Sequence, residues 1–172
     1  MTLESELTAT VTDRFENSFS IPLPPSQAWS VLSDIRHVAA CIPGVQLNEA
    51  ESDGTYLGRF SVQLGGIPLS FACMARLEEP DPVRHEARLR AHGLSDSGHG
   101  RADADMYFRV TPTGGGSMIE VHTELVLSGA AAKYGGNVKL VQITAGLIMN
   151  QFASNLAARF AAEAARIAQA SV

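Results

Sequence analysis

Hydrophobic and polar residues alternate along most of the chain up to Leu127, and helical periodicity replaces this alternation after Leu140. Seven segments place apolar side chains on one face and polar side chains on the other, which is typical of half-buried strands. Gly, Pro and Asp residues separate several of them at hairpin spacing. The predicted strands cover residues 11–21, 45–51, 56–64, 67–78, 83–92, 100–110 and 119–127. Because each is apolar on one face only, the sequence predicts an antiparallel sheet with one wet and one covered side.

The C-terminal part of the chain predicts a long amphipathic helix. No charged side chain occurs from Leu140 to Ala158, but six polar residues interrupt the run, and such residues are costly at bilayer depth. A membrane span is therefore excluded, and the helix is expected to lie on a broad apolar surface. The polar residues are Gln142, Thr144, Asn150, Gln151, Ser154 and Asn155. The apolar stripe is Val141, Ala145, Ile148, Met149, Phe152, Leu156 and Phe160.

Two short helices are expected between the first two strands. Prolines end the first strand, and proline suits the first turn of a helix, which predicts a helix over residues 26–33. Asp34 is placed as the cap of a second helix over residues 35–40, which Pro43 and Gly44 end. The order of elements predicts an α+β protein in which a seven-stranded, curved antiparallel sheet wraps around the long C-terminal helix.

Small residues on the inner faces of the strands leave two alternatives open. They indicate either close packing of the helix on the sheet or a cavity between the two, and an apolar cavity favours an apolar ligand. These residues are Gly58, Ala87, Ala91, Ala102 and Ala104.

Composition narrows the class of protein. The chain has 172 residues, of which 45% are hydrophobic and 18% charged, so we expect one globular domain over residues 1–172 with an ordered core at about 11–168. The formal charge of −5 and the absence of a basic stripe argue against nucleic acid. The N-terminus does not resemble a signal peptide, and Cys41 and Cys73 are expected to be free thiols, which together predict a cytoplasmic protein.

One string of residues resembles a known family. It runs Trp29-Ser-Val-Leu32, Asp34, then Ala40-Cys41-Ile42-Pro43-Gly44-Val45, and it is joined by Gly129 and by Met149-Asn-Gln-Phe152-Ala-Ser-Asn-Leu156. A helix that follows Pro-Pro and contains Trp29, and then a Cys-Ile-Pro-Gly corner, together resemble the carbon monoxide dehydrogenase G-subunit family. That family belongs to the START-like, polyketide-cyclase-like (SRPBCC) superfamily with the helix-grip fold. The resemblance covers about residues 15–160.

The resemblance implies a hydrophobic cavity between sheet and C-terminal helix, holding a quinone or another lipid-like molecule. It also implies an accessory role beside a molybdenum-containing dehydrogenase at the inner membrane face. Two features depart from the family pattern. The chain ends at Val172, whereas members often carry a C-terminal extension, and the run from Gly129 to Gly136 differs from the usual approach to the helix.

Four polar residues on inward faces are candidates for orienting a ligand. Alternation places His85 inside, where it could hydrogen-bond a ligand carbonyl or hydroxyl, or be a core histidine bonded to a backbone group. Asp13, Asn17 and Thr123 could orient a ligand or lie at the wet rim of the sheet.

Large inward side chains could line a pocket or simply fill the core. The predicted ligand-binding residues are Asn17, Trp29, Phe60, Phe71, Cys73, His85, Met106, Phe108, Thr123, Ile148, Met149 and Phe152. The corner of Cys41, Ile42, Pro43 and Gly44 either only turns the chain or forms the mouth of the cavity.

No catalytic residue, metal or other cofactor is predicted. The sequence shows no nucleophile–base–orienter trio, and His92, Asp96 and His99 are more typical of a solvated loop than of a metal site. The favoured function is a non-catalytic accessory protein that binds a hydrophobic small molecule. The rivals are a cyclase or dehydratase that uses His85 with an inward carboxylate, and a ligand-free assembly subunit. The outer helix residues Leu140, Ile143 and Leu147 could contact a protein partner, a second copy of the chain or lipid headgroups.

Overall fold

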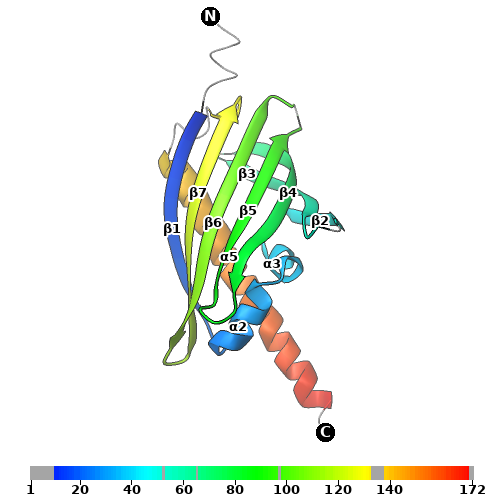
Figure 1. Cartoon of the computed structure of the whole chain (residues 1–172), viewed down its shortest axis with the longest axis vertical. Helices are drawn as coiled ribbons and strands as arrows, with labels where there is room; N and C mark the ends of the chain where they lie inside the picture. Colours follow the sequence, from blue (N-terminus) through cyan, green and yellow to red (C-terminus); the bar gives the residue numbers. More distant parts are fainter. Residues whose placement is uncertain (1–9, 52, 65, 97, 133–137, 171–172) are drawn as a thin grey trace, which may run out of the picture.

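The expected α+β architecture is confirmed by the computed structural model, which describes residues 10–51, 53–64, 66–96, 98–132 and 138–170 (Figure 1). Its seven strands form one antiparallel sheet in the order β1-β7-β6-β5-β4-β3-β2. The strands are β1 (Thr10–Ile21), β2 (Val45–Ala50), β3 (Tyr56–Leu64), β4 (Ile67–Asp81), β5 (Glu86–Ser95), β6 (Gly100–Thr113) and β7 (Gly116–Gly129). The helices are α2 (Pro25–Leu32), α3 (Ile35–Cys41) and α5 (Val138–Ala170).

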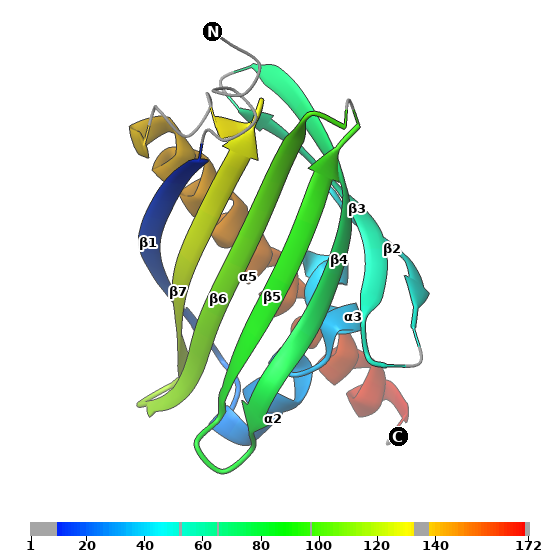
Figure 2. The same cartoon turned by 45° about the horizontal axis from the view of Figure 1, so that its top comes forward.

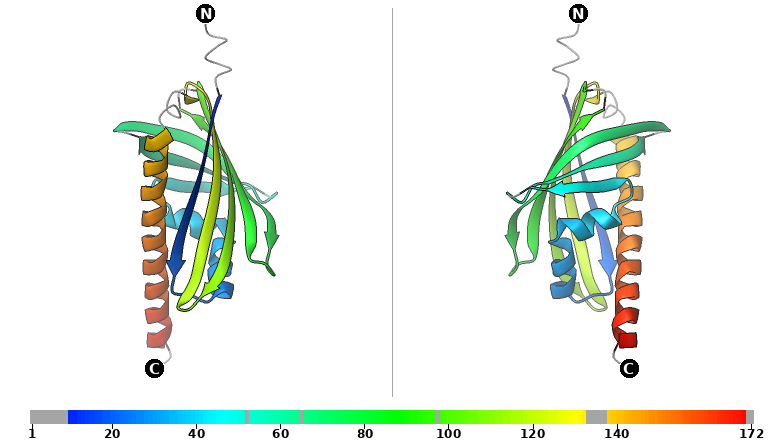
Figure 3. Two further views of the ribbon diagram at one scale, coloured as in Figure 1. Left: turned by 90° about the vertical axis from the view of Figure 1, so that its left-hand side faces the viewer. Right: turned by 90° about the vertical axis from the view of Figure 1, so that its right-hand side faces the viewer.

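The sheet curls around α5, which runs along its concave face (Figures 2 and 3). The helix packs against β1 on one side and against α3 and β3 on the other. Its predicted apolar stripe is confirmed where the helix is most buried, because Val141, Phe152 and Leu156 are all buried. Ile143 and Leu147 lie on the outer face and are 52% and 64% exposed.

The two short helices form as the sequence predicts. Pro25 begins α2, and the Ala28 amide donates to the Pro24 carbonyl oxygen at 3.0 Å. Asp34 caps α3 by accepting a hydrogen bond from the Arg36 amide at 3.0 Å. Helix α2 lies at the end of the sheet where β1 finishes, and α3 lies beside β2 (Figure 1).

The fifth strand begins later than the sequence predicts. The alternating pattern predicts a strand from residue 83, which is wrong, because β5 begins at Glu86 and residues 82–85 form a turn. The Asp81 carboxylate accepts hydrogen bonds from the Val83 and Arg84 amides at 3.0 and 3.1 Å, and this side-chain turn replaces strand pairing. The pattern places Val83 on the inner face, but this residue is 88% exposed.

The main core lies at the α2 end of the sheet, where α2, α3 and the second half of α5 meet the strands. We call this region the closed half of the concave face. Its buried cluster consists of Ile21, Ala28, Trp29, Leu32, Cys41, Ala87, Phe108, Val110, Ile119, Val121, Phe152 and Leu156.

The corner after α3 is held from two sides. The Asn155 side-chain amide of α5 donates to the Cys41 carbonyl oxygen at 2.9 Å. On the other side, the Ser61 amide donates to the Gly44 carbonyl oxygen at 2.9 Å. Gly44 has a φ of +84°, and a side chain there would overlap the Ser61 carbonyl oxygen. Glycine is therefore required at this corner both by its backbone conformation and by the close approach of β3.

We expect Gly44→Ala to be strongly destabilising and Gly54→Ala to be a mild, matched control. Both glycines have positive φ, at +84° and +89°, but nothing lies within 4 Å of a Cβ at Gly54. The control should lose about 1 kcal/mol from backbone strain, and Gly44→Ala about 2–4 kcal/mol because the overlap is added. Urea unfolding of the two variants measures the difference, and equal losses would show that β3 does not constrain the corner.

Candidate functional site

The half of the concave face away from α2 is lined by small residues. Strand register places two rows of them across β4, β5 and β6, namely Cys73–Gly93–Ala102 and Ala75–Ala91–Ala104. All except Gly93 remain partly exposed, whereas Ala87 and Phe108 in the closed half are 2% and 9% exposed. We call this region the open half of the concave face. Because its apolar side chains still reach solvent, α5 does not pack solidly against it.

Several predicted ligand-binding residues border the open half. Met106 follows the small rows on β6, and Ile148 and Met149 lie on the stripe of α5, all three partly exposed. Phe60 and Phe71 form a cross-strand pair one row beyond Cys73, and Phe71 is buried. These large side chains surround the rows of small ones.

Cys73 lies among the small residues of the open half as an inert thiol. Its Sγ donates a weak hydrogen bond to the Phe71 carbonyl oxygen at 3.6 Å. Burial raises the pKa of the Cys73 thiol, so at neutral pH it is protonated and presents a largely apolar surface.

Three other predicted residues lie in the closed half. Trp29, Phe108 and Phe152 all belong to the buried core cluster. The Trp29 and Phe108 rings lie 6.0 Å apart, and Phe152 meets Phe19 edge-on at 5.7 Å. Their surroundings show packing, and their predicted contact with a ligand stays a prediction.

His85 lies at the end of the closed half, in the β4–β5 turn. Its ring stacks on Trp29 with centroids 5.7 Å apart, and its carbonyl oxygen accepts from the Val110 amide at 2.9 Å. The φ of His85 is +55°, which a strand residue would not adopt. The side chain is partly exposed, so the predicted inward strand position is wrong although the ring does cover the core tryptophan.

Asp13, Asn17 and Thr123 are confirmed on the concave face, at the pairing of β1 with β7. Asp13 is 3% exposed and Thr123 is 7% exposed. One oxygen of each side chain is buried without a hydrogen-bond partner: Asp13 Oδ2, Asn17 Oδ1 and Thr123 Oγ1. Buried polar atoms are rarely left in this state, so these three oxygens are the polar atoms of this face that most need a hydrogen-bond partner.

The predicted mouth residues lie where α3 meets β2. Cys41 is 2% exposed and belongs to the core, whereas Pro43 and Gly44 are exposed. The corner is thus anchored at one end and reaches the surface at the other. Its role as a mouth stays a prediction.

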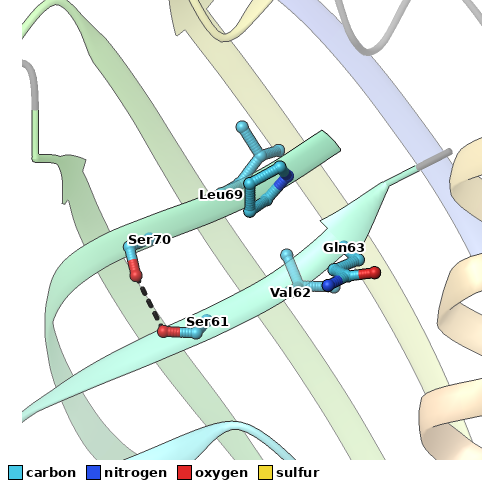
Figure 4. Close-up of a pocket in the computed structure, with 6 residues that line it drawn as sticks. Ser61, Val62, Gln63, Leu69 and Ser70 are labelled. Carbon is cyan, nitrogen blue, oxygen red and sulfur yellow. Dashed lines mark hydrogen bonds between the residues drawn. The ribbon is translucent and has the colours of Figure 1, made fainter. Parts of the chain in front are cut away.

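The described part of the surface includes a depression at each of two places. One, of about 440 Å³, lies at the β3–β4 hairpin between Val62 and Leu69, beside a 2.7 Å hydrogen bond joining Ser61 and Ser70 (Figure 4). The other, of about 600 Å³, is lined mainly by charged residues of the convex face. Cross-strand ion pairs such as Arg14–Glu124 and Arg109–Glu120, each at 2.9 Å, lie on that convex side.

Metal and membrane-spanning features are not found in the described residues. No group of three or more His, Cys, Asp or Glu side chains there could hold a metal ion. His92, one of the loop histidines considered above, instead meets Asp103 at 2.6 Å on the neighbouring strand. Within the same part of the chain, no helix has both the length and the apolar character needed to cross a bilayer.

Sequence reasoning missed two features of this face. The first is the Asn155 bond that ties α5 to the corner, because the amide and its acceptor are 114 positions apart. The second is the position of Thr123 diagonally opposite both Asp13 and Asn17, for which the one available signal was three polar residues on otherwise apolar strand faces.

The sequence of residues 18–161 matches the family model of the carbon monoxide dehydrogenase G-subunit (CoxG). No curated protein matches the chain. The family match covers the end of β1, all of β2 to β7, both short helices and α5 as far as residue 161.

Solved structures similar to this chain share its fold at low sequence identity. A conserved protein from Geobacillus kaustophilus is 18% identical with a TM-score of 0.67, over 88% of this chain and 95% of that one. A START superfamily protein from Mycobacterium smegmatis is 16% identical with a TM-score of 0.56, over 85% and 95%. The Zhui aromatase/cyclase from Streptomyces sp. R1128 is 17% identical with a TM-score of 0.56, over 86% and 93%. These likenesses show the START-like fold.

We expect iodoacetamide to alkylate Cys73 slowly at neutral pH. A raised pKa keeps the thiol protonated, so the rate should fall as pH falls and should still be rising above about pH 8.5, the ordinary thiol value. Peptide mass spectrometry distinguishes Cys73 from Cys41, which is 2% exposed and should react only on unfolding. A rate at Cys73 that levels off below about pH 8 would contradict this environment.

Proposed function

The chain belongs to the carbon monoxide dehydrogenase G-subunit (CoxG) family, and on this basis we propose that it is a non-catalytic accessory protein that binds a quinone or lipid-like molecule under α5. The observation that carries the proposal is the open half of the concave face. Its apolar wall is partly exposed although it lies between a sheet and a helix. Covering such a surface with an apolar ligand is favourable by about 25 cal/mol per Å².

The chemistry of the wall supports a flat or elongated apolar ligand. The rows that contain Ala91 and Ala104 have small side chains, which leave space above the sheet for a broad ligand. Phe71 and Met149 supply large apolar side chains beside these rows. Ordinary ligand sites combine such walls with a few polar groups that fix orientation. Asp13 lies in the cross-strand row of Ala104 and Ala91 and Thr123 in the next row, so these two are the polar groups nearest the wall. Asn17 lies one row further, toward the closed half.

The partner that we propose is a molybdenum-containing dehydrogenase, which the carrier would serve from the cytoplasm at the inner membrane face. The outer face of α5 supports a contact surface, because Ile143 and Leu147 are exposed one helical turn apart. An exposed apolar pair within the uncharged run from Leu140 to Ala158 is a candidate for partner contact. A second copy of the chain or a membrane surface are the alternative occupants.

The cyclase or dehydratase alternative has weaker support. It requires His85 to act with an inward carboxylate, and Asp13 is the candidate. His85 bonds to Val110, which lies in the same cross-strand row as Phe19, six residues beyond Asp13 on β1. At about 3.4 Å per residue the two groups are separated by about 20 Å along the strands, too far for joint proton transfer.

We expect Ala91→Phe to block ligand binding with little effect on folding. The new ring would fill the open half, so affinity for a short-chain ubiquinone analogue or a fluorescent fatty acid should fall at least about tenfold, the equivalent of about 1.4 kcal/mol. If the region were solidly packed, the same change would cost about 1–3 kcal/mol of stability.

Leu94→Phe is the matched control for this substitution. Leu94 lies on the same strand but on the convex side and is 55% exposed, so binding should be unchanged. Binding is followed by the fluorescence of Trp29, the single tryptophan, and native ligand by organic extraction and mass spectrometry. Destabilisation of Ala91→Phe without any ligand effect would contradict the proposal.

We expect Leu147→Glu to weaken partner contact while leaving the fold and ligand binding intact. Leu147 is 64% exposed, so a charge there disturbs only what covers it. Gln142→Glu adds the same charge at an exposed polar position of the same helix and is the control. Pull-down tests contact with the dehydrogenase, elution volume tests contact with a second copy of the chain, and liposome flotation tests contact with a membrane. If Leu147→Glu changes none of the three, this face of α5 is not a contact surface.

A further inference from the structure

Three oxygens without hydrogen-bond partners lie along one strip of the concave face, where β1 pairs with β7. Register pairs Phe15 with Thr123, and Asp13 and Asn17 are the residues two positions before and after Phe15. Alternation turns all three polar side chains to the same side, and diagonal neighbours on paired strands lie about 7–8 Å apart between Cα atoms. Thr123 is thus a diagonal neighbour of both Asp13 and Asn17, which are about 13–14 Å apart along β1. One side-chain oxygen of each of the three residues is buried without a partner.

No described side chain of the neighbouring strands donates a hydrogen bond to these three oxygens. Among the described residues on the concave faces of β1, β6 and β7, Asp13 carries the only ionisable side chain. The neighbours on these strands are apolar, with Leu125 opposite Asp13 and Met106 opposite Thr123. Burying three such oxygens in an apolar wall is costly unless a hydrogen-bond donor reaches them.

We infer that Asp13, Asn17 and Thr123 form a polar subsite that binds a hydroxyl group on an otherwise apolar ligand. A carboxylate oxygen and an amide oxygen accept hydrogen bonds, and the threonine hydroxyl can accept or donate. A ligand hydroxyl donates to the carboxylate or amide and accepts from Thr123. A ligand of the same shape with only carbonyl or ether oxygens, an oxidised quinone included, can accept from Thr123 but cannot donate to the carboxylate or the amide. Within the proposed class of quinone or lipid-like ligands, the subsite therefore favours a quinol or a hydroxylated lipid.

A neutral hydroxyl fits this subsite better than a protonated amine. The subsite has one carboxylate in an apolar wall, and burying an ion pair there would require both charges to lose their hydration. A hydroxyl group loses much less hydration than an ammonium group when it enters an apolar site. The inference rests on the proposed function for the existence of the ligand site, and adds the chemical class of its ligand.

The test compares the affinities of matched probes by isothermal titration calorimetry of the full chain. Naphthol has a donor hydroxyl, methoxynaphthalene has the same oxygen without the proton, naphthalene has neither, and naphthylmethylamine has a cation. We expect naphthol to bind about tenfold more tightly than methoxynaphthalene, because one hydrogen bond to a charged acceptor contributes that much.

Variants at the subsite should remove the preference for naphthol and leave naphthalene binding unchanged. Thr123→Val keeps the shape without the hydroxyl, and Asp13→Leu replaces the acceptor by an apolar group. Thr123→Ser retains the hydroxyl and should keep the preference, which separates loss of the hydrogen bond from a change in packing. Thermal unfolding checks that each variant is folded, and if Asp13→Leu does not fold, the comparison of Thr123→Val with Thr123→Ser decides.

The outcomes separate this inference from the proposed function. Equal binding of naphthol, methoxynaphthalene and naphthalene would overturn the hydroxyl subsite and leave the apolar site standing. Tightest binding of naphthylmethylamine would assign the subsite to a cation and overturn the hydroxyl assignment. If no probe binds, the ligand site itself is absent and both proposals fail.

Discussion

A single helix cannot cover the concave face of a seven-stranded sheet. Neighbouring strands are about 4.8 Å apart, so the sheet is roughly 30 Å wide, whereas a helix with its side chains measures about 10–12 Å across. The short helices α2 and α3 add cover at one end, and the buried cluster forms there. Beyond them, apolar side chains of β4, β5 and β6 stay partly exposed. The closed and open halves follow from this difference in width.

Side-chain size and polarity follow the same division. Large residues such as Trp29 and Phe108 fill the half that helices cover, and small ones such as Ala91 and Ala104 lie where only α5 passes. Ion pairs occupy the convex side, which water reaches. The exception is the unpaired polar group around Thr123, and such local departures from the pattern are where binding sites are expected.

Much of the fold was predictable because it depends on local patterns. Alternation identifies every strand, the helical stripe identifies α5, and the position of Asp34 is sufficient to recognise it as a cap. The error at His85 has a specific cause. The alternating pattern continues through residues 83–85, but hydrogen bonds to the Asp81 carboxylate hold these residues in a turn, and alternation carries no signal for such bonds.

The sequence by itself determined which residues face inward, because a strand alternates its faces at every residue and this depends only on neighbours in the chain. It therefore sufficed to place Asn17 and Thr123 on the inner face. Only the tertiary structure decided that these two residues are diagonal neighbours, since register joins strands that lie far apart in the sequence. It also decided which inward residues became core and which stayed accessible, because burial depends on where α5 crosses a curved sheet.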